Sequence, residues 1–182
     1  MSKRKVAAAV VCSVSVIIGI VLNNGQVRTN KAGLELIGNA ESCRRDPYVC
    51  PAGVLTDGIG NTHGVIEGTR KTDEQIAADW QRNIIDAERC INREFRGRDM
   101  TDNTFSAMVS AAFRMGCTGL KTYYSKTSGE RVQTSIHKWA QAGSWVNMCN
   151  HLPDFVNGGG QRLPGLVIRA AKEETLCLSG LQ

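Results

Sequence analysis

The sequence predicts an α+β fold: a small N-terminal lobe with a β-hairpin, a long connecting helix and a helical C-terminal lobe. Three observations support this prediction. Turn residues and a glycine-rich segment within residues 46–60 are typical of a β-hairpin. Residues 72–95 carry apolar side chains at helical spacing throughout. Further helical patterns follow between residues 103 and 178.

The length and charge of the chain limit the kinds of protein it can be. At 182 residues it forms one domain, or two small lobes around one core. Its net charge of +5 favours anionic partners such as nucleic acid, anionic lipid or a bacterial wall polymer. The alternative interpretation is that the basic surface is simply a solvated face. No zinc-type cysteine pair, phosphate-binding loop or nucleic-acid motif is visible in the sequence. We therefore expect no metal, no cofactor and no nucleic-acid partner. We also expect the protein to be a monomer.

Residues 1–28 are predicted to form a membrane segment and a linker. Basic residues at 3–5 precede an uncharged apolar run at 6–22. The run has about 17 residues, the short limit for spanning a hydrocarbon core of roughly 30 Å, and the basic flank keeps the N-terminus cytoplasmic. A cleavable signal peptide is the alternative, but residues 21–25 lack a small-x-small site. The run is only weakly apolar, so we expect an uncleaved anchor that can slip out of the membrane.

Residues 30–41 are predicted to form a helix that ends at a carboxylic acid. Asn30 is a suitable N-cap, and Leu34, Ile37 and Glu41 share one helical face at spacings of three and four residues. Apolar surroundings favour the protonated form of a carboxyl group, which a general acid at neutral pH requires. The alternative interpretation is a solvated Glu41 in the last helical turn.

A hairpin is predicted directly after Glu41. Residues 46–48 and 51–53 are turn signals, and residues 54–60 are typical of a short strand rich in glycine. Glycine in a strand lets another backbone or a substrate chain approach closely. We therefore expect the hairpin to face Glu41 across a cleft. His63, close to the next turn, is interpreted as structural rather than catalytic.

The connecting helix begins at a capping box. Thr72 and Gln75 are spaced as the N-cap and third residue of such a box. The apolar face of the helix that follows consists of Ile76, Trp80, Ile84, Ala87 and Ile91. A helix of this length is suited to joining two lobes.

The C-terminal part is predicted to be helical. We expect helices at 103–115, 132–142, 145–152 and 166–178, with the first of them stopped at 116–119 and a flexible glycine loop at 157–160. The larger aromatic side chains of this part are assigned to the core, with sugar stacking in a cleft as the alternative; they are Trp139, Trp145 and Phe155. Candidate cleft contacts are Arg114 and Arg162.

The spacing of these features resembles one known family. Glu41 is followed nine residues later by Cys50 and six residues after that by Thr56. A Gly-Ile-Gly strand lies at 58–60, and a Leu-Pro-Gly-Leu segment ending in an arginine lies at 163–169. Over essentially the whole chain this pattern resembles the phage-type lysozymes, endolysins that cut peptidoglycan. More closely, it resembles their signal-arrest-release class, which exports itself on an uncleaved N-terminal segment.

The resemblance implies a lysozyme-like catalytic domain at 29–182. Within it, the small lobe would span 29–71, the connecting helix 72–95 and the helical lobe 96–182. The implied activity is hydrolysis of the β-1,4 bond between N-acetylmuramic acid and N-acetylglucosamine in peptidoglycan, which causes lysis of the host cell. The implied location is the host inner membrane, facing the periplasm, after export by the host secretion machinery. The released protein would then be soluble in the periplasm.

The resemblance also implies the catalytic roles. Glu41 would protonate the leaving oxygen, while a second group activates water or stabilises the sugar cation on the opposite face. The family has an aspartate in that second place, and Cys50 departs from the pattern. A thiolate at Cys50 supplies negative charge and nucleophilicity, and Arg44 and Arg45 would favour that thiolate. Thr56 would position the water or the sugar face.

The seven cysteines indicate an oxidising compartment. Cys43 and Cys50 are close enough in sequence to pair, which would remove the Cys50 thiolate and leave the membrane-tethered form inactive. On release, Cys12 would attack Cys43 and free Cys50 by thiol exchange, which resembles the switch of endolysins with a thiol in the anchor. The alternative is a permanent Cys43–Cys50 disulfide.

The other four cysteines are predicted to form structural disulfides. We choose the pairs Cys90–Cys117 and Cys149–Cys177, although four cysteines allow three pairings.

Two other functions stay open from the sequence. One is a lytic transglycosylase on a related fold, which needs only Glu41 and leaves Cys50 structural. The other is a non-enzymatic, membrane-anchored module that binds the wall.

Overall fold

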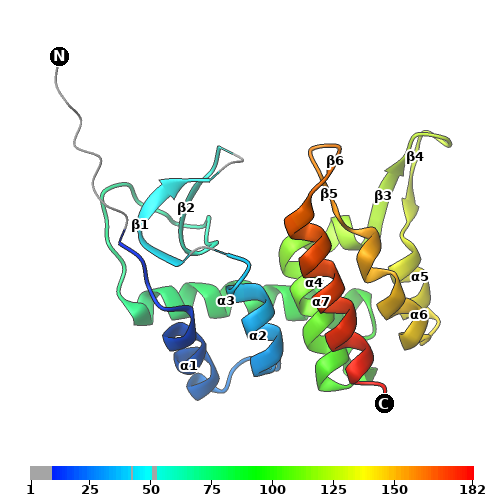
Figure 1. Cartoon of the computed structure of the whole chain (residues 1–182), viewed down its shortest axis with the longest axis horizontal. Coiled ribbons are helices and arrows are strands. Elements are labelled where there is room, and N and C mark those ends of the chain that lie inside the picture. The colour runs from blue at the N-terminus through cyan, green and yellow to red at the C-terminus, as the bar shows by residue number, and fades with distance from the viewer. Residues whose placement is uncertain (1–9, 42, 51–52) are drawn as a thin grey trace.

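The computed structural model describes residues 10–41, 43–50 and 53–182, and it confirms the α+β prediction (Figure 1). The small lobe contains α1 (Val14–Asn24), α2 (Lys31–Gly38), β1 (Cys43–Val49) and β2 (Leu55–Ile59). The long helix α3 (Asp73–Glu94) runs horizontally in Figure 1, behind α1 and α2, and leads from the small lobe to the second lobe. The remaining elements form the second lobe; they are the 3-10 helices Gly97–Asp99 and Leu152–Asp154, helices α4 (Asp102–Lys121), α5 (Ser135–Gln141), α6 (Trp145–Asn150) and α7 (Pro164–Ser179), and strands β3 (Thr122–Ser125), β4 (Glu130–Gln133), β5 (Asn157–Gly158) and β6 (Gln161–Arg162).

Helix α3 begins as the sequence predicts. Thr72 Oγ1 accepts a hydrogen bond from the N–H of Gln75 at 3.3 Å, and Gln75 Oε1 accepts one from the N–H of Thr72 at 2.9 Å. These two bonds satisfy N–H groups that have no partner within the helix. The predicted apolar face is buried; it consists of Ile76, Trp80, Ile84, Ala87 and Ile91. The capping box and the amphipathic pattern together account for a single long helix.

The hairpin differs from the prediction in its first strand. β1 pairs antiparallel with β2, with Cys43 opposite Ile59 and Tyr48 opposite Thr56. Residues 46–48, predicted as a turn, lie within β1, and the register is irregular between Arg44 and Tyr48. Proline has no N–H to donate and is tolerated in strands at such irregularities. The turn prediction at 46–48 is therefore wrong, because pairing with β2 overrides the local signal.

The apolar N-terminal run is divided in the structure. Residues 1–9 lie outside the described part of the chain. Helix α1 starts only at Val14, after the N-cap Ser13, and Ile17 and Val21 are fully buried in the core. Among the helices that the structure describes, none combines the length and the apolar character needed to cross a membrane. Within the described part of this run, residues 10–13 therefore precede the helix rather than belong to it.

The predictions for the C-terminal lobe need three corrections. Residue 132 belongs to β4, and the helix predicted from there begins at Ser135, where Thr134 Oγ1 accepts from the N–H of His137 at 3.2 Å. Gly116 breaks α4 with φ of 70°, but the helix resumes after it. Residues 157–160, predicted as a flexible loop, form part of the β5–β6 hairpin, whose turn glycines have positive φ. Pairing between strands explains the differences at residue 132 and at residues 157–160.

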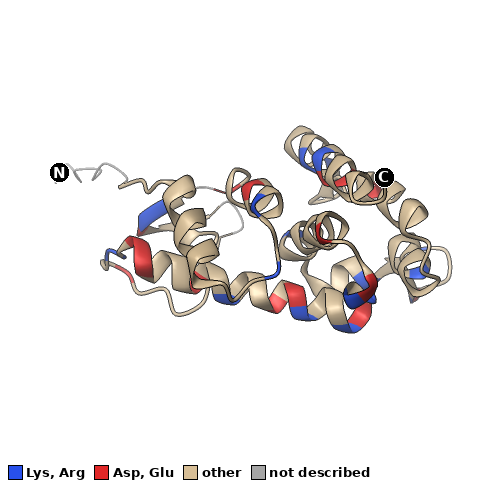
Figure 2. Cartoon of the chain, turned by 90° about the horizontal axis from the view of Figure 1, so that it is seen from below, with Lys and Arg blue, Asp and Glu red and all other residues tan. Residues whose placement is uncertain are grey.

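The charged side chains of α3 are mixed in sign. Figure 2 shows Lys and Arg interspersed with Asp and Glu along this helix. Arg82 pairs with Asp79 at 2.8 Å and Arg89 with Asp86 at 2.9 Å, one turn apart. Exposed pairs of this kind contribute little to stability. The surface of α3 is therefore a solvated face of mixed charge rather than a basic patch.

Candidate functional site

Glu41 lies between the two lobes. Helix α2 ends at Gly38, and the N–H of Glu41 donates to the Gly38 carbonyl at 3.3 Å. The predicted position of Glu41 on the helix itself is therefore wrong, because it follows the helix end. Its side chain is 30 % exposed, and Oε1 lies 3.2 Å from Nη1 of Arg169 on α7. The carboxylate thus faces an arginine of the opposite lobe rather than a purely apolar surface.

Arg169 belongs to a buried network of charges. Its Nε donates to Oε1 of Glu173 at 3.2 Å, and Glu173 Oε2 accepts from Nη2 of Arg114 at 2.8 Å. The Glu173 side chain is fully buried and those of Arg169 and Arg114 are 8 % and 6 % exposed. Ser110 Oγ also donates to Glu173, at 2.7 Å. Two arginines therefore balance two carboxylates, and the network holds the Arg169 guanidinium in place against Glu41.

Sequence reasoning assigned no role to Glu173, and it noted Arg169 only as part of a motif. Arg169 and Glu173 are four residues apart on one helix, a spacing at which side chains contact each other. This spacing was the signal in the sequence that could have predicted the pair. Arg114, a predicted cleft contact, lies in this network. Arg162, the other predicted contact, is exposed on β6.

Gly60 lets the end of the hairpin approach Glu41. A Cβ atom at Gly60 would lie 3.3 Å from Glu41 Oε2, and the residue has φ of 69°. Asp57 and Asn61 exchange two backbone hydrogen bonds of 2.9 Å around it, which closes a tight turn. A side chain at Gly60 would be both strained and crowded. Glycine at this position therefore matches the sequence prediction of a close approach.

Lys71 anchors this turn to α3. Its Nζ lies 2.7 Å from Oδ2 of the buried Asp57 and 2.5 Å from Oδ2 of Asp79. Burial alone would lower the pKa of Lys71, but the two carboxylates outweigh it and raise the pKa above its ordinary value. The lysine therefore stays charged, and it joins β2 to the start of the long helix.

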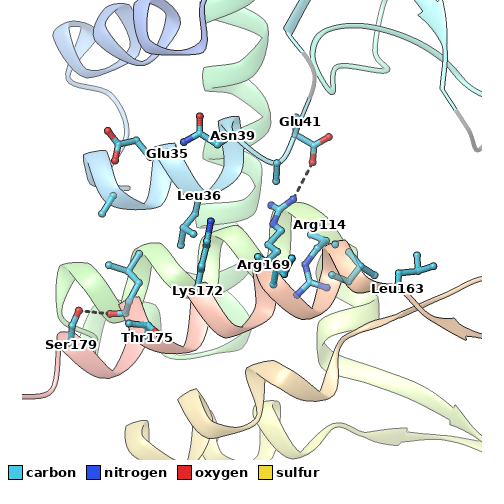
Figure 3. Close-up of a pocket in the computed structure, with 16 residues that line it drawn as sticks. Glu35, Leu36, Asn39, Glu41, Arg114, Leu163, Arg169, Lys172, Thr175 and Ser179 are labelled. Atoms are coloured by element: carbon cyan, nitrogen blue, oxygen red, sulfur yellow. Dashed lines mark hydrogen bonds and ion pairs between the residues drawn. The ribbon is translucent and has the colours of Figure 1, made fainter.

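A groove of about 900 Å³ runs between α2 and α7, with Glu41 at one end (Figure 3). Its walls are largely apolar, with Leu36 on α2 and Leu176 on α7, and Glu35 and Lys172 add one charge from each side. The described residues that line it include neither Cys50 nor Thr56. A second hollow, of about 370 Å³, has Gly60 in its lining. It is lined by the loop at 60–63, α3 and α4, including His63 and Phe113.

The two other predicted catalytic residues lie on the hairpin. Thr56 is 3 % exposed, and its Oγ1 donates to the Val54 carbonyl at 3.0 Å. Cys50 is half-buried at the end of β1, and its N–H donates to the same carbonyl at 2.9 Å. The Val54 carbonyl therefore links the two residues at the end of the hairpin where β1 connects to β2. Of their predicted cationic neighbours, Arg44 pairs with Asp46 and Arg45 with Asp73.

Three disulfides lie within the described residues. Cys12 is joined to Cys43, which connects the segment before α1 to the first residue of β1. The other two are Cys90–Cys117 and Cys149–Cys177, the pairs chosen from the sequence. Cys50 lies outside these three disulfides. The pairing predicted for the tethered form, Cys43 with Cys50, is thus replaced here by the pairing predicted after release.

Comparisons with known proteins agree with this geometry. A family model described as phage lysozyme matches residues 38–173. A SAR-endolysin of Escherichia phage P1 is 70 % identical over 181 residues, which cover 98 % of each chain. The crystal structure of the active form of P1 phage endolysin Lyz is 71 % identical, with a TM-score of 0.93 over 95 % of this chain and 97 % of that one.

The secreted inactive form of the same endolysin is also similar, but less so. Its TM-score is 0.65 over 85 % of this chain and 97 % of that one, at the same identity of 71 %. The conformation described above is therefore closer to the active form of that relative. With the family model matching most of its length and so similar a relative, the chain belongs to the phage lysozyme family and is an enzyme of that family.

Proposed function

We propose that this lysozyme is a signal-arrest-release endolysin that hydrolyses the β-1,4 bond between N-acetylmuramic acid and N-acetylglucosamine in peptidoglycan and so lyses the host cell. The similarity to the SAR-endolysin of phage P1 supports the class. The net charge of +5 suits an anionic wall polymer. The chemistry rests on Glu41, which lies between the lobes at the end of a groove.

Glu41 acts as the general acid. Arg169 donates to Oε1, and Gly60 approaches Oε2, so the two carboxyl oxygens have different surroundings. An arginine remains protonated at any working pH and cannot supply the proton itself. In the proton-donating state the proton therefore sits on Oε2, and the hydrogen bond from Arg169 to Oε1 fixes the direction in which Oε2 delivers it to the leaving oxygen.

Cys50 supplies the second catalytic group, and Thr56 positions the water. A Cys50 thiolate stabilises the sugar cation, or acts on it as base or nucleophile, on the face opposite Glu41. The hydroxyl hydrogen of Thr56 is used by the Val54 carbonyl. Its oxygen lone pairs remain as acceptors, so Thr56 orients a water by accepting a hydrogen bond from it. Analysis of the anomeric configuration of the product distinguishes a base from a nucleophile.

The enzyme is exported in an inactive form in which Cys43 pairs with Cys50. Its N-terminal segment crosses the host inner membrane with the N-terminus in the cytoplasm, after export by the host secretion machinery. When the segment leaves the bilayer, Cys12 forms a disulfide with Cys43 in place of Cys50, and the Cys50 thiol is released in the periplasm. The observation that carries this part is the Cys12–Cys43 disulfide, found in a chain whose fold is closer to the active form of its relative.

The catalytic proposal is tested by loss of turbidity of outer-membrane-permeabilised cells. Glu41→Gln should abolish lysis, because an amide cannot donate the proton of a general acid. Glu35→Gln is the matched control, because Glu35 lines the same groove but is not paired with Arg169. Equal lysis by wild type and Glu41→Gln would end the glycosidase proposal. Among the products, a reducing muramic acid indicates hydrolysis, whereas a 1,6-anhydro end would indicate a lytic transglycosylase.

The activation proposal is tested by Cys12→Ser. This variant should be exported but inert, since nothing then displaces Cys50 from Cys43, and mild reduction should restore lysis. Ser15→Ala, an exposed change in the same segment, should behave as wild type. Full lysis by unreduced Cys12→Ser would contradict the switch.

A further inference from the structure

A short third strand pairs with the edge of β1 that faces away from β2. The N–H of Cys12 donates to the Cys43 carbonyl at 3.1 Å, and the N–H of Arg45 donates to the Val10 carbonyl at 2.8 Å. Val11 and Arg44 form the antiparallel bridge between these two bonds. Residues 10–12 therefore extend the β1–β2 hairpin from the side opposite β2, and this pairing sets Cys12 beside Cys43.

A side chain of β1 completes the pairing. Asp46 Oδ1 accepts a hydrogen bond from the N–H of Val10 at 2.8 Å, and Oδ2 accepts one from Nη2 of Arg44 at 2.5 Å. The Arg44 guanidinium also lies over the Tyr48 ring, 4.5 Å from its centroid. The N–H of Val10, and after it Arg44, hold the pKa of Asp46 below its usual value. Asp46 is thus a charged acceptor at neutral pH, aimed at the N-terminal end of the third strand.

This contact anchors the N-terminal end of the third strand on β1. Asp46 faces Val10 and Cys43 faces Cys12, so the two contacts are separated by two residues on the N-terminal segment and three on β1, across the irregular stretch of that strand. In a paired strand a slip of one residue turns every side chain to the opposite face. A slipped segment would direct the Cys12 sulfur away from Cys43. The Asp46 carboxylate adds a charged acceptor to the backbone bonds, and this bond holds residues 10–12 along β1 where Cys12 lies beside Cys43.

We propose that Asp46 is a positioning residue for the activating thiol exchange: it captures the N–H of Val10 and so presents Cys12 to Cys43. This inference rests on the proposed activation by Cys12. In the exchange, the Cys12 thiol loses its proton to solvent and its sulfur attacks Cys43 Sγ. The Cys12–Cys43 bond forms as the Cys43–Cys50 bond breaks, and Cys50 leaves as a thiolate. One disulfide replaces another, so no external oxidant or reductant is consumed.

The test measures how strongly the fold holds Cys12 against Cys43. In a full-length Cys50→Ser protein, equilibrium with reduced and oxidised glutathione gives the effective concentration of Cys12 at Cys43, read as the disulfide fraction by mass spectrometry of alkylated peptides. Asp46→Ala should lower this effective concentration by roughly tenfold, the loss expected for a hydrogen bond to a charged acceptor. Asp46→Asn keeps a side-chain oxygen for Val10 and should retain most of it.

Two controls separate positioning from general loss of structure. The Cys90–Cys117 disulfide in the same molecules should keep its effective concentration in every variant. Asp99→Ala removes another aspartate that is paired with a nearby arginine but lies far from the N-terminal segment, and it should match the parent protein. An unchanged value for Asp46→Ala, or an equal loss for Asp46→Asn, would overturn the proposal.

The same substitutions in the wild-type background connect this result to activation. Asp46→Ala should slow the appearance of Cys12–Cys43 after release, by about the same factor as it lowers the effective concentration. The glutathione measurement requires no lysis and no Cys50. It therefore stands even if Cys50 proves not to be catalytic, and a failure of the switch can be told apart from a failure of Asp46 to position the strand.

Discussion

The ion pair between Glu41 and Arg169 is the contact through which the helical lobe touches the proposed acid. Arg169 is 8 % exposed and also contacts the buried Glu173. Removing one partner of a buried ion pair leaves the other charge without compensation, which costs far more than the net value of the pair. The same arginine therefore serves both the stability of α7 and the orientation of Glu41.

Arg169→Lys should lower kcat for wall hydrolysis by about ten- to a hundredfold while KM changes little. A lysine keeps the charge but has no planar fork, so it cannot hold Glu41 and Glu173 together, and a small misplacement of a catalytic group has an effect of this size. Lys172→Met is the control, because Lys172 lines the same groove on α7 without an ion pair to Glu41. Equal losses in both variants would show that the groove as a whole, rather than Arg169, matters.

His137 is a neutral ring held between two polar contacts. Its Nε2 donates to the Glu94 carbonyl at 2.9 Å, its Nδ1 accepts from Gln133 at 2.9 Å, and its ring meets Phe95 edge-on at 5.0 Å. Burial lowers the pKa of His137, and the positive charge of Lys121 adds to this, while the Glu94 contacts oppose it. The folded protein therefore binds a proton at this site less readily than the unfolded chain does.

This difference predicts a dependence of stability on pH. A histidine with a lowered folded pKa contributes stability that is fully present above its unfolded pKa of about 6.5 and is lost as the pH falls through the folded pKa. Urea unfolding should give a lower free energy of unfolding at pH 5 than at pH 7. His137→Gln should reduce this slope, whereas His63→Gln, which removes an exposed ring, should keep it. A slope that survives in His137→Gln would assign the effect to other groups.

At the scale of elements, glycine decides how closely α2 packs on α4. A Cβ at Gly33 would lie 2.6 Å from Ser106 Cβ and 3.3 Å from its Cα, so the two helix backbones are nearly in contact. Glycine normally weakens a helix by about 1 kcal/mol relative to alanine. Gly33 is therefore explained by the close packing of α2 on α4. This packing places the end of α2, and Glu41 after it, next to the second lobe.

Gly33→Ala should lower the free energy of unfolding by about 1–3 kcal/mol, because the overpacking outweighs the gain in helix propensity. Gly19→Ala in α1 is the matched control, since nothing lies within 4 Å of an added Cβ there. It should raise the free energy of unfolding by up to about 1 kcal/mol. Denaturant unfolding of both variants measures the two effects, and a stabilised Gly33→Ala would contradict the close packing.

The elements that the sequence misassigned are the ones held by distant partners. Residues 46–48 have the composition of a turn, yet Tyr48 pairs with Thr56 across the hairpin. Val132 begins a helical pattern, yet it pairs with Tyr123 on β3. Short strands contain too few residues for periodicity to identify them. The long helix, by contrast, is specified by a cap and a face that lie within neighbouring turns.

At the scale of the whole molecule, helix α1 of the N-terminal run belongs to the core of this conformation. Ile17 and Val21 of α1 are fully buried, in the same cluster as Trp80 of α3 and Phe105 of α4. The apolar side chains proposed to hold the chain in the bilayer are thus the ones that complete the small lobe after release. The bilayer and the protein core both favour these apolar side chains, because both remove their surface from water.

Ile17→Ala should lower the free energy of unfolding of the released enzyme by about 2–5 kcal/mol, the usual effect of truncating a fully buried isoleucine. Val16→Ala changes an adjacent side chain that is 49 % exposed, and it should stay within about 0.5 kcal/mol of wild type. Unfolding of both variants followed by circular dichroism tests this. A neutral Ile17→Ala would mean that α1 does not pack in the released enzyme as described.

The sequence by itself determined the long capped helix, the amphipathic helices, the glycines near the acid, and the spacing of Glu41, Cys50 and Thr56. These features depend on neighbours within a few residues, so local chemistry specifies them. Only the tertiary structure decided that Arg169, 128 residues further along, meets Glu41. It alone also placed Asp46 against Val10 and α1 in the core. Contacts between distant residues depend on how the elements pack together, and no local pattern records that packing.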